Sequence, residues 1–305
     1  MAKRDLRKYF GDLYMQGADI RLEEPMSWHT TMRIGGRVPF FVSPYSVDSM
    51  IKILKLVESE KIPHRLIGGG SNVVCPEHYG GIVLSTAHLN AVRIDGTSVT
   101  AQAGVPVNTL IWLCLSEGLT GLEFLTGLPG TVGGAVYMNA GAFGGEIGSL
   151  VKSVEYIDEN YDLHSIEGSL CQFGYRYSLF KERGYKIMNV EFSLAKGKRE
   201  AIESKMGEML RKRLEKQPLD LPSAGSVFVR PYQDFFVGST IEKLGLKTLS
   251  VGDAQVSSKH AGFIVNRGKA SYADVVLLIE KLKESVLEAT GVTLSTEIEL
   301  WREVE

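Results

Sequence analysis

The sequence predicts a chain of mixed helices and strands that is divided into two or three domains. Its 305 residues are more than one hydrophobic core usually holds. Hydrophobic residues make up 44% and charged residues 23%, which are the proportions of a folded globular protein rather than a disordered one. Segments with strand patterns and segments with helical spacing follow one another along the chain.

The first third of the chain predicts a strand–helix–strand unit that ends in a glycine turn. After a short helical lead-in over the first 30 residues, Val38–Val42 predicts a strand. Ser46–Glu60 carries apolar residues at helical spacing, and Pro63 ends this helix. His64–Ile67 predicts the next strand, directly before the glycine turn.

The rest of the chain alternates between short strands and helices. Helical spacing is clearest in Val275–Ala289, where Ser271 with Asp274 predicts a capping box and Gly291 a natural end. Other helices are predicted at Asn108–Glu117 and Glu200–Leu214, and Pro218 and Pro222 mark a turn or linker. Further strands are predicted at Ile82–Ser85, Ala91–Asp95, Ser98–Ala103, Lys152–Asp158, Lys186–Leu194, Ser226–Arg230, Gly262–Asn266 and Thr296–Trp301.

Charge and cysteine content argue against several classes of function. The 34 Lys and Arg against 36 Asp and Glu give a net charge of -2, so we expect neither nucleic acid nor a membrane as a partner. No apolar stretch approaches the ~20 residues of a membrane span. Three widely spaced cysteines, Cys75, Cys114 and Cys171, favour a reducing compartment, and we expect a cytoplasmic protein. The six histidines show no metal-ligand spacing, so we expect no metal.

Glycine carries the clearest functional signal, because 33 glycines make up about 11% of the chain against a usual ~7%. The first glycine segment, Gly68-Gly69-Gly70-Ser71-Asn72, follows a predicted strand. Such a turn can aim backbone N–H groups at phosphate oxygens, and Ser71 and Asn72 add side-chain donors. A flexible turn is the alternative. The segment is neither a P-loop, since no Lys-Ser/Thr pair follows, nor the dinucleotide fingerprint before a helix.

A second glycine segment, Gly127–Gly144, is longer and more specific. Few of its residues carry a charged side chain, so a site built from it would bind through backbone groups and close approach. It suits a large planar or pyrophosphate-bearing ligand better than it suits proton chemistry. The alternative is a glycine-packed crossover between strands.

Five motifs in order carry a resemblance to a known family. They are Gly68–Asn72, Gly127–Gly144, Tyr175-Arg176-Tyr177-Ser178, Ala224-Gly225-Ser226-Val227-Phe228 and His260-Ala261-Gly262-Phe263-Ile264-Val265-Asn266. Together they resemble the UDP-N-acetylenolpyruvoylglucosamine reductases, also called UDP-N-acetylmuramate dehydrogenases, from about Thr30 to Leu300. No extra tyrosine-bearing loop separates Arg176 from Ser226, which resembles the shorter subclass of the family.

This resemblance implies an α+β fold, a two-lobed FAD-binding domain of vanillyl-alcohol-oxidase type plus a C-terminal α+β substrate-binding domain. We expect lobe boundaries at 1–96 and 97–198, and a C-terminal domain at 199–305. The implied activity is NADPH-dependent reduction of the enolpyruvyl ether of UDP-N-acetylglucosamine to UDP-N-acetylmuramate, in peptidoglycan precursor synthesis. The partners are then small molecules, the sugar nucleotide and NADPH.

The same resemblance implies one non-covalent FAD. Gly68, Gly69, Gly70, Ser71 and Asn72 would hold its pyrophosphate. The remainder would be lined by Gly130, Thr131, Gly133, Gly134, Asn139 and Gly141. Two rivals stay open: another flavin oxidase of this fold, in which Cys75 or His78 could tether the flavin, and a non-catalytic nucleotide-binding protein.

Three residues are implied to be catalytic. Arg176 would stabilise the enolate-like charge at the substrate carboxylate, because its fixed fork suits a carboxylate. Ser226 would donate the proton to the adjacent carbon. Glu297 would hold Arg176, Ser226 or a water in the protonation state that delivers the proton, with Glu299 as the alternative. His260 has no assigned role.

Overall fold

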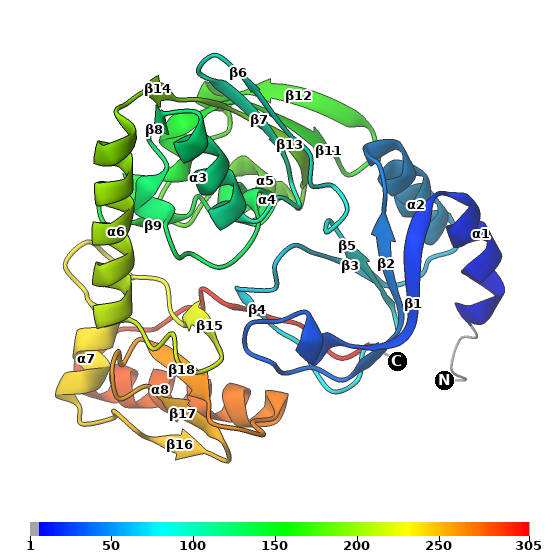
Figure 1. Cartoon of the computed structure of the whole chain (residues 1–305). Coiled ribbons are helices and arrows are strands. Elements are labelled where there is room, and N and C mark those ends of the chain that lie inside the picture. Colours follow the sequence, from blue (N-terminus) through cyan, green and yellow to red (C-terminus); the bar gives the residue numbers. More distant parts are fainter. Residues whose placement is uncertain (1–5, 305) are drawn as a thin grey trace.

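A computed structural model of the chain, described over residues 6–304, has three bodies arranged around a common centre (Figure 1). Lobe 1 is built on β1, β2, β3 and β5, lobe 2 on a sheet of five strands, and the C-terminal body on a sheet of four strands flanked by α8. Helices and strands are mixed in each body, which confirms the α+β expectation. No helix among residues 6–304 is long and apolar enough to cross a membrane.

Lobe 1 contains a mixed four-stranded sheet in the order β1-β2-β5-β3. β1 and β2 are antiparallel, whereas β5 runs parallel to both β2 and β3. The α2 helix covers this sheet with Met50, Ile53, Leu54 and Val57, all of them buried. The elements are η1 (Leu6–Tyr9), α1 (Phe10–Met15), β1 (Ala18–Pro25), η2 (Met26–Trp28), β2 (Arg37–Pro44), α2 (Val47–Ser59), β3 (His64–Ile67), β4 (Val73–Val74) and β5 (Ile82–Ser85).

Lobe 2 contains an antiparallel five-stranded sheet in the order β12-β11-β13-β7-β6. Its core lies between this sheet and helices α3 and α4. Its strands are β6 (Val92–Asp95), β7 (Ser98–Gln102), β8 (Leu119–Thr120), β9 (Gly141–Ala142), β10 (Gly145–Glu146), β11 (Val151–Ile157), β12 (Leu163–Glu167), β13 (Lys186–Ser193) and β14 (Ala195–Lys196). Its helices are α3 (Val107–Ser116), η3 (Glu123–Leu125), α4 (Val132–Tyr137), η4 (Ile147–Leu150), η5 (Gly168–Leu170) and α5 (Leu179–Arg183).

The C-terminal body is reached through α6 and returns to lobe 1 through β19, which pairs in parallel with β4. Its sheet has the order β15-β18-β17-β16. The elements are α6 (Arg199–Lys216), β15 (Ser223–Ser226), α7 (Val237–Lys243), β16 (Ser250–Val251), β17 (Ala254–Val256), β18 (Phe263–Asn266), α8 (Tyr272–Thr290) and β19 (Glu299–Leu300). α6 begins directly after the expected boundary at 198/199, and it contributes Ile202 and Met206 to the core of lobe 2.

Local signals set the ends of the best-predicted helix, α8. The Ser271 side chain accepts a hydrogen bond from Asp274 N, and the Asp274 carboxylate accepts one from Ser271 N. Gly291 ends the helix in the left-handed conformation with a φ of 72°. The capping box and the glycine end predicted from sequence are therefore confirmed.

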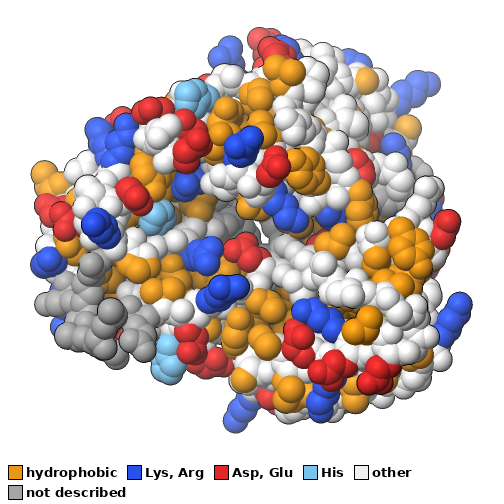
Figure 2. All heavy atoms as spheres, turned by 180° about the vertical axis from the view of Figure 1, so that it is seen from behind, with side chains coloured by type: hydrophobic (Ala, Val, Ile, Leu, Met, Phe, Trp, Pro, Cys, Tyr) orange, Lys and Arg blue, Asp and Glu red, His pale blue; other side chains and the backbone are white. Residues whose placement is uncertain are grey.

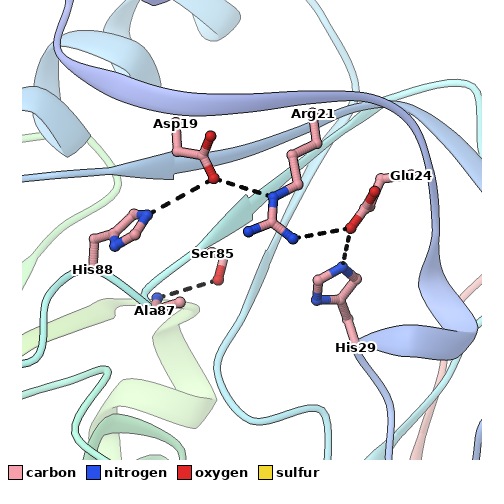
Figure 3. Close-up of polar contacts among 7 residues, drawn as sticks. All are labelled: Asp19, Arg21, Glu24, His29, Ser85, Ala87 and His88. Carbon is pink, nitrogen blue, oxygen red and sulfur yellow. Dashed lines mark hydrogen bonds and ion pairs between the residues drawn. The ribbon is translucent and has the colours of Figure 1, made fainter.

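The N-terminal lead-in contains a strand, β1, as well as helix, and the sequence pattern did not predict this strand. Asp19, Arg21 and the buried Glu24 interrupt the apolar alternation that predicts a strand. These side chains form a polar network with two histidines (Figure 3). Arg21 contacts both carboxylates, Glu24 lies 2.8 Å from His29 Nε2, and Asp19 lies 3.8 Å from His88 Nε2. Both histidines therefore have structural partners.

Charged side chains of both signs are interspersed over the face seen in Figure 2. No group of three or more His, Cys, Asp or Glu within residues 6–304 has the arrangement that could hold a metal ion.

Candidate active site

The two glycine segments pack directly against each other between lobes 1 and 2. A β-carbon added to Gly69 would lie 2.7 Å from Gly130 Cα, and one added to Gly130 would lie 2.7 Å from Ser71 Oγ. Both distances are shorter than van der Waals contact, so only glycine permits this approach. Gly130 also has a φ of 121°, which side chains rarely allow.

Thr31 fixes the first glycine segment from the other side. Its N–H donates to the carbonyl of Gly70 at 3.1 Å, and its hydroxyl donates to the carbonyl of Ser223 at 2.7 Å. The segment is thus tied both to lobe 1 and to β15 of the C-terminal body.

These segments line the inner cavity, which has a volume of about 610 Å³. Ten of the eleven residues predicted to bind the cofactor line it. They are Gly68, Gly69, Gly70, Ser71, Asn72, Gly130, Thr131, Gly133, Gly134 and Gly141. The eleventh, Asn139, does not, because its side chain is buried and used within lobe 2: it donates to Glu146 and Gly174 and accepts from Gly148 N.

Four backbone N–H groups and two hydroxyls of the inner cavity lack hydrogen-bond partners within the described chain. The N–H groups of Gly69, Gly70, Ser71 and Asn72 donate no hydrogen bond among residues 6–304. The buried hydroxyls of Thr86 and Thr131 also have no partner there. Buried hydroxyls are rarely left unpaired, and a turn of free N–H groups can bind anionic oxygens. This wall therefore fits a ligand that carries many acceptors, as the phosphates and flavin ring of FAD do.

Arg213 adds a buried positive charge to the same cavity. It is 2% exposed and donates to the carbonyl of Thr126 at 3.0 Å and to the Gln217 side chain at 3.3 Å. Burial lowers its pKa, and no carboxylate pairs with it in the part of the chain that the structure describes. A buried cation without an acidic partner favours an anionic ligand.

An outer cavity of about 590 Å³ adjoins the inner one. Six residues line both and are called the junction: Gly141, Ala142, Phe143, Arg176, Ser226 and Glu297. The three residues predicted to be catalytic thus lie where the two cavities meet. They come from two bodies, Arg176 from lobe 2 and the other two from the C-terminal body.

The chain brings Ser226 and Glu297 together by pairing the segments that follow and precede them. Val229 N donates to Ser295 O at 2.9 Å, and Glu297 N donates to Val227 O at 2.7 Å. The predicted strands Ser226–Arg230 and Thr296–Trp301 therefore lie side by side. The predicted strand Thr296–Trp301 contains β19, whereas β15 ends at Ser226, where the strand predicted over Ser226–Arg230 was expected to begin.

Arg176 and Glu297 form an ion pair at the junction. Arg176 Nε lies 2.7 Å from Glu297 Oε1, with side chains 22% and 10% exposed. The Nε–H has no partner in hydrogen-bond geometry, so the contact is an attraction of charges rather than a directed bond. Burial raises the pKa of Glu297, against the opposing effects of Arg176 and Lys181.

Glu299, the alternative to Glu297, has a different environment. Its side chain is 50% exposed, lies 3.8 Å from Arg65 and lines only the inner cavity. It makes no ion pair with Arg176 in the described chain. The geometry therefore favours Glu297 for the junction.

A cation and two aromatic rings line the outer cavity. The Arg230 guanidinium lies 5.6 Å from the Tyr175 ring and 4.8 Å from the Phe236 ring. His260 also lines this cavity, and its Nδ1 accepts a hydrogen bond from Gly262 N at 3.1 Å. This contact leaves Nε2 as the N–H of a neutral ring, and burial lowers the pKa of His260.

Cys75 and His78 do not line the inner cavity. Cys75 is 1% exposed in the core of lobe 1, and burial raises the pKa of its thiol. His78 is exposed. Neither is placed to tether a ligand of the cavity.

Comparison with known proteins places the whole chain in one family. Residues 38–166 match the FAD binding domain, and residues 217–301 match the C-terminal domain of UDP-N-acetylenolpyruvoylglucosamine reductase. The reductase of that name from Thermotoga sp. strain RQ2 is 45% identical over 295 residues, covering 96% of this chain and 97% of the relative. The chain belongs to the UDP-N-acetylenolpyruvoylglucosamine reductase family.

Other members of the reductase family agree in length and fold. The reductase from Petrotoga mobilis is 42% identical over 297 residues, 95% of this chain and 97% of the relative. The crystal structure of the reductase from Thermus caldophilus matches with a TM-score of 0.78 at 30% identity, covering 93% of this chain and 99% of that one. The FAD-binding and reductase C-terminal domains thus confirm the predicted family and fold class.

Sequence reasoning missed Thr86, Lys181 and Arg213. A signal for Arg213 was present, because Ile202, Met206, Met209 and Arg213 recur at helical spacing on the buried face of α6. A charged residue on an otherwise apolar face predicts a buried partner or ligand. No comparable signal marks Thr86 or Lys181.

Proposed function

We propose that the chain reduces the enolpyruvyl ether of UDP-N-acetylglucosamine to UDP-N-acetylmuramate, with NADPH as the hydride donor and one non-covalent FAD. The reaction belongs to peptidoglycan precursor synthesis. The observation that carries the proposal is the junction, where an Arg–Glu ion pair and a serine line both the inner and the outer cavity.

The inner cavity suits FAD and the outer one the substrate. Gly68–Asn72 would hold the pyrophosphate through free N–H groups, and Gly130–Gly134, which packs against this segment, would line the remainder of the site. When bound there, FAD would supply the hydride chemistry between NADPH and the vinyl end of the substrate. The Arg230, Tyr175 and Phe236 group offers charge and ring faces for a sugar nucleotide.

Three of the junction residues would act on the charge that hydride addition creates. Hydride addition to the vinyl end leaves negative charge on the adjacent carbon and its carboxylate. Arg176 would stabilise this charge, and the Ser226 hydroxyl would donate a proton to the carbon. Glu297 would keep the guanidinium oriented by its 2.7 Å contact with Nε.

We further propose that NADPH and the enolpyruvyl nucleotide use the outer cavity in turn. The outer cavity, at about 590 Å³, is of a size that takes one such ligand at a time. Steady-state kinetics should then give parallel double-reciprocal lines. Intersecting lines would contradict the shared cavity.

An absorbance experiment tests the proposed function directly. The purified protein should be yellow, and acid precipitation should release its flavin into the supernatant. NADPH should bleach the flavin band, and the enolpyruvyl nucleotide should restore it without oxygen. Reoxidation by oxygen but not by this nucleotide would indicate a different flavin oxidase, and a colourless protein that cannot be reconstituted would indicate a nucleotide-binding protein.

A further inference from the structure

The backbone of Arg176 has an unusual conformation. Arg176 has a φ of 55°, in the left-handed region that non-glycine residues seldom occupy. It lies in a tight turn that Gly174 and Tyr177 close with two backbone hydrogen bonds of 3.0 and 3.1 Å. Such a residue costs about 1–3 kcal/mol and persists only where its surroundings hold it.

Lys181 is the side chain that holds the Arg176 backbone directly. Its Nζ donates to the Arg176 carbonyl at 3.0 Å. The α5 helix begins just after the turn, and the Ser178 hydroxyl caps it by accepting from Lys181 N at 3.2 Å. The same hydroxyl donates to Tyr137 O at 2.7 Å and so fixes the helix to lobe 2. The first turn of α5 therefore folds Lys181 back onto Arg176.

This hydrogen bond uses a cation that has no ion-pair partner. No carboxylate lies within ion-pair distance of Lys181 Nζ among residues 6–304. Burial lowers the pKa of Lys181, while the negative charge of Glu297 opposes that effect. A hydrogen bond from a charged donor is about twice as strong as a neutral one. The Lys181 amino group therefore stabilises the position of the Arg176 carbonyl.

Lys181 lines neither the inner nor the outer cavity. It is thus not placed to touch the cofactor or the substrate, and any effect on the reaction must pass through Arg176 or Glu297. We propose that Lys181 is a positioning residue for the reduction of the enolpyruvyl nucleotide: it holds Arg176 in the left-handed conformation that brings the guanidinium to Glu297 and to the junction. The inference rests on the proposed function.

The test measures the two half-reactions of the holoenzyme separately. Lys181→Met removes the hydrogen bond and keeps the aliphatic chain. It should retain FAD and be reduced by NADPH at close to the wild-type rate. Its reoxidation by the enolpyruvyl nucleotide should be slowed about 10- to 100-fold, because a small misplacement of a catalytic group has costs of this size. Lys181→Arg, which restores a cationic donor, should recover most of the rate.

A double-mutant cycle separates positioning from a general loss of structure. In an Arg176→Ala background, Lys181→Met should change reoxidation by no more than about twofold, the usual error of additivity. Lys152→Met is the matched control, because Lys152 is an exposed lysine of lobe 2 that pairs with Glu191 at 2.9 Å, remote from both cavities. It should reoxidise as wild type does.

Three outcomes would overturn the inference. The first is wild-type reoxidation in Lys181→Met, and the second is an equal slowing in the Arg176→Ala background. If Lys181→Met does not fold, Lys181→Gln, which keeps an N–H donor, takes its place in the same measurements. The third outcome is loss of FAD from Lys181→Gln as well. Failure of the proposed function is distinguishable, because the wild-type protein itself would then not be reoxidised by the nucleotide.

Discussion

Replacement of Gly69 tests whether the contact between the two glycine segments forms the flavin site. The β-carbon in Gly69→Ala would lie 2.7 Å from Gly130 Cα, whereas ordinary contact begins at 3.4 Å. One or both backbones must therefore move by about 0.7 Å, the difference between these two distances. Overpacking of this kind costs about 1–3 kcal/mol.

The cost should appear in the affinity for FAD. The apoprotein can relieve the strain by separating the segments, whereas a flavin that bridges them requires both in place. At 1.4 kcal/mol for each factor of ten, the dissociation constant of FAD should rise about 5- to 150-fold. The larger Gly69→Val should abolish binding and leave the C-terminal body folded, because the core of that body does not include residue 69.

Fluorescence titration of the apoprotein with FAD measures this effect. Gly207→Ala is the matched control, since a β-carbon there meets nothing within 4 Å. It lies on α6 outside both cavities and should bind FAD normally, with slightly higher thermal stability. Wild-type FAD affinity in Gly69→Val would refute the assignment of the pyrophosphate to this segment.

Three further outcomes follow from burial. Burial raises the thiol pKa of Cys114 to about 12 and of Cys171 to about 11, and that of Cys75 still further, so a thiol reagent at pH 8 should label no cysteine until denaturant is added. Because the pKa of Glu297 is raised above 4.5 in the folded state, the folded protein binds this proton more tightly, and stability falls as the pH rises through the raised pKa. The Tm of Glu297→Gln minus that of wild type should thus increase as the pH rises above 4.5, and an unchanged difference would contradict the burial argument. Arg213→Met should weaken FAD binding at least about tenfold in a titration. It should not lower the Tm of the apoprotein, since an apolar chain replaces a buried unpaired cation. Normal FAD affinity would leave Arg213 without a role in the cavity.

Local patterns predicted those elements whose ends are set by neighbouring residues. α8 has its capping box and terminal glycine, β5 is a buried apolar run, and β3 is a short strand that ends directly before the glycine turn. The edge strand β1 was missed, because the charged residues of its polar network hide the alternation of a strand. α4 was missed because it lies inside the second glycine segment, where its short helix depends on backbone contacts with Ala103 and Val105.

For the candidate site too, the sequence predicted what neighbouring residues determine and not what the fold determines. The glycine segments are contiguous in sequence, and the structure places ten of their predicted residues in one cavity. Asn139 does not line this cavity, because its amide is used within lobe 2, which only the fold shows. Glu297 could not be separated from Glu299 by alternation alone. The distinction depends on Arg176, which comes from lobe 2 and approaches only Glu297.

The most direct test of the junction is stopped-flow analysis of Ser226→Ala. Ser226 lines both cavities, and its hydroxyl would supply the proton that completes reduction of the substrate. The variant should bind FAD and be reduced by NADPH at close to the wild-type rate, because that half-reaction needs no proton from Ser226. Its reoxidation by the enolpyruvyl nucleotide should be slowed about 10²–10⁴-fold. Reoxidation as fast as in the wild-type enzyme would show that the proton comes from elsewhere and would contradict the role of the junction.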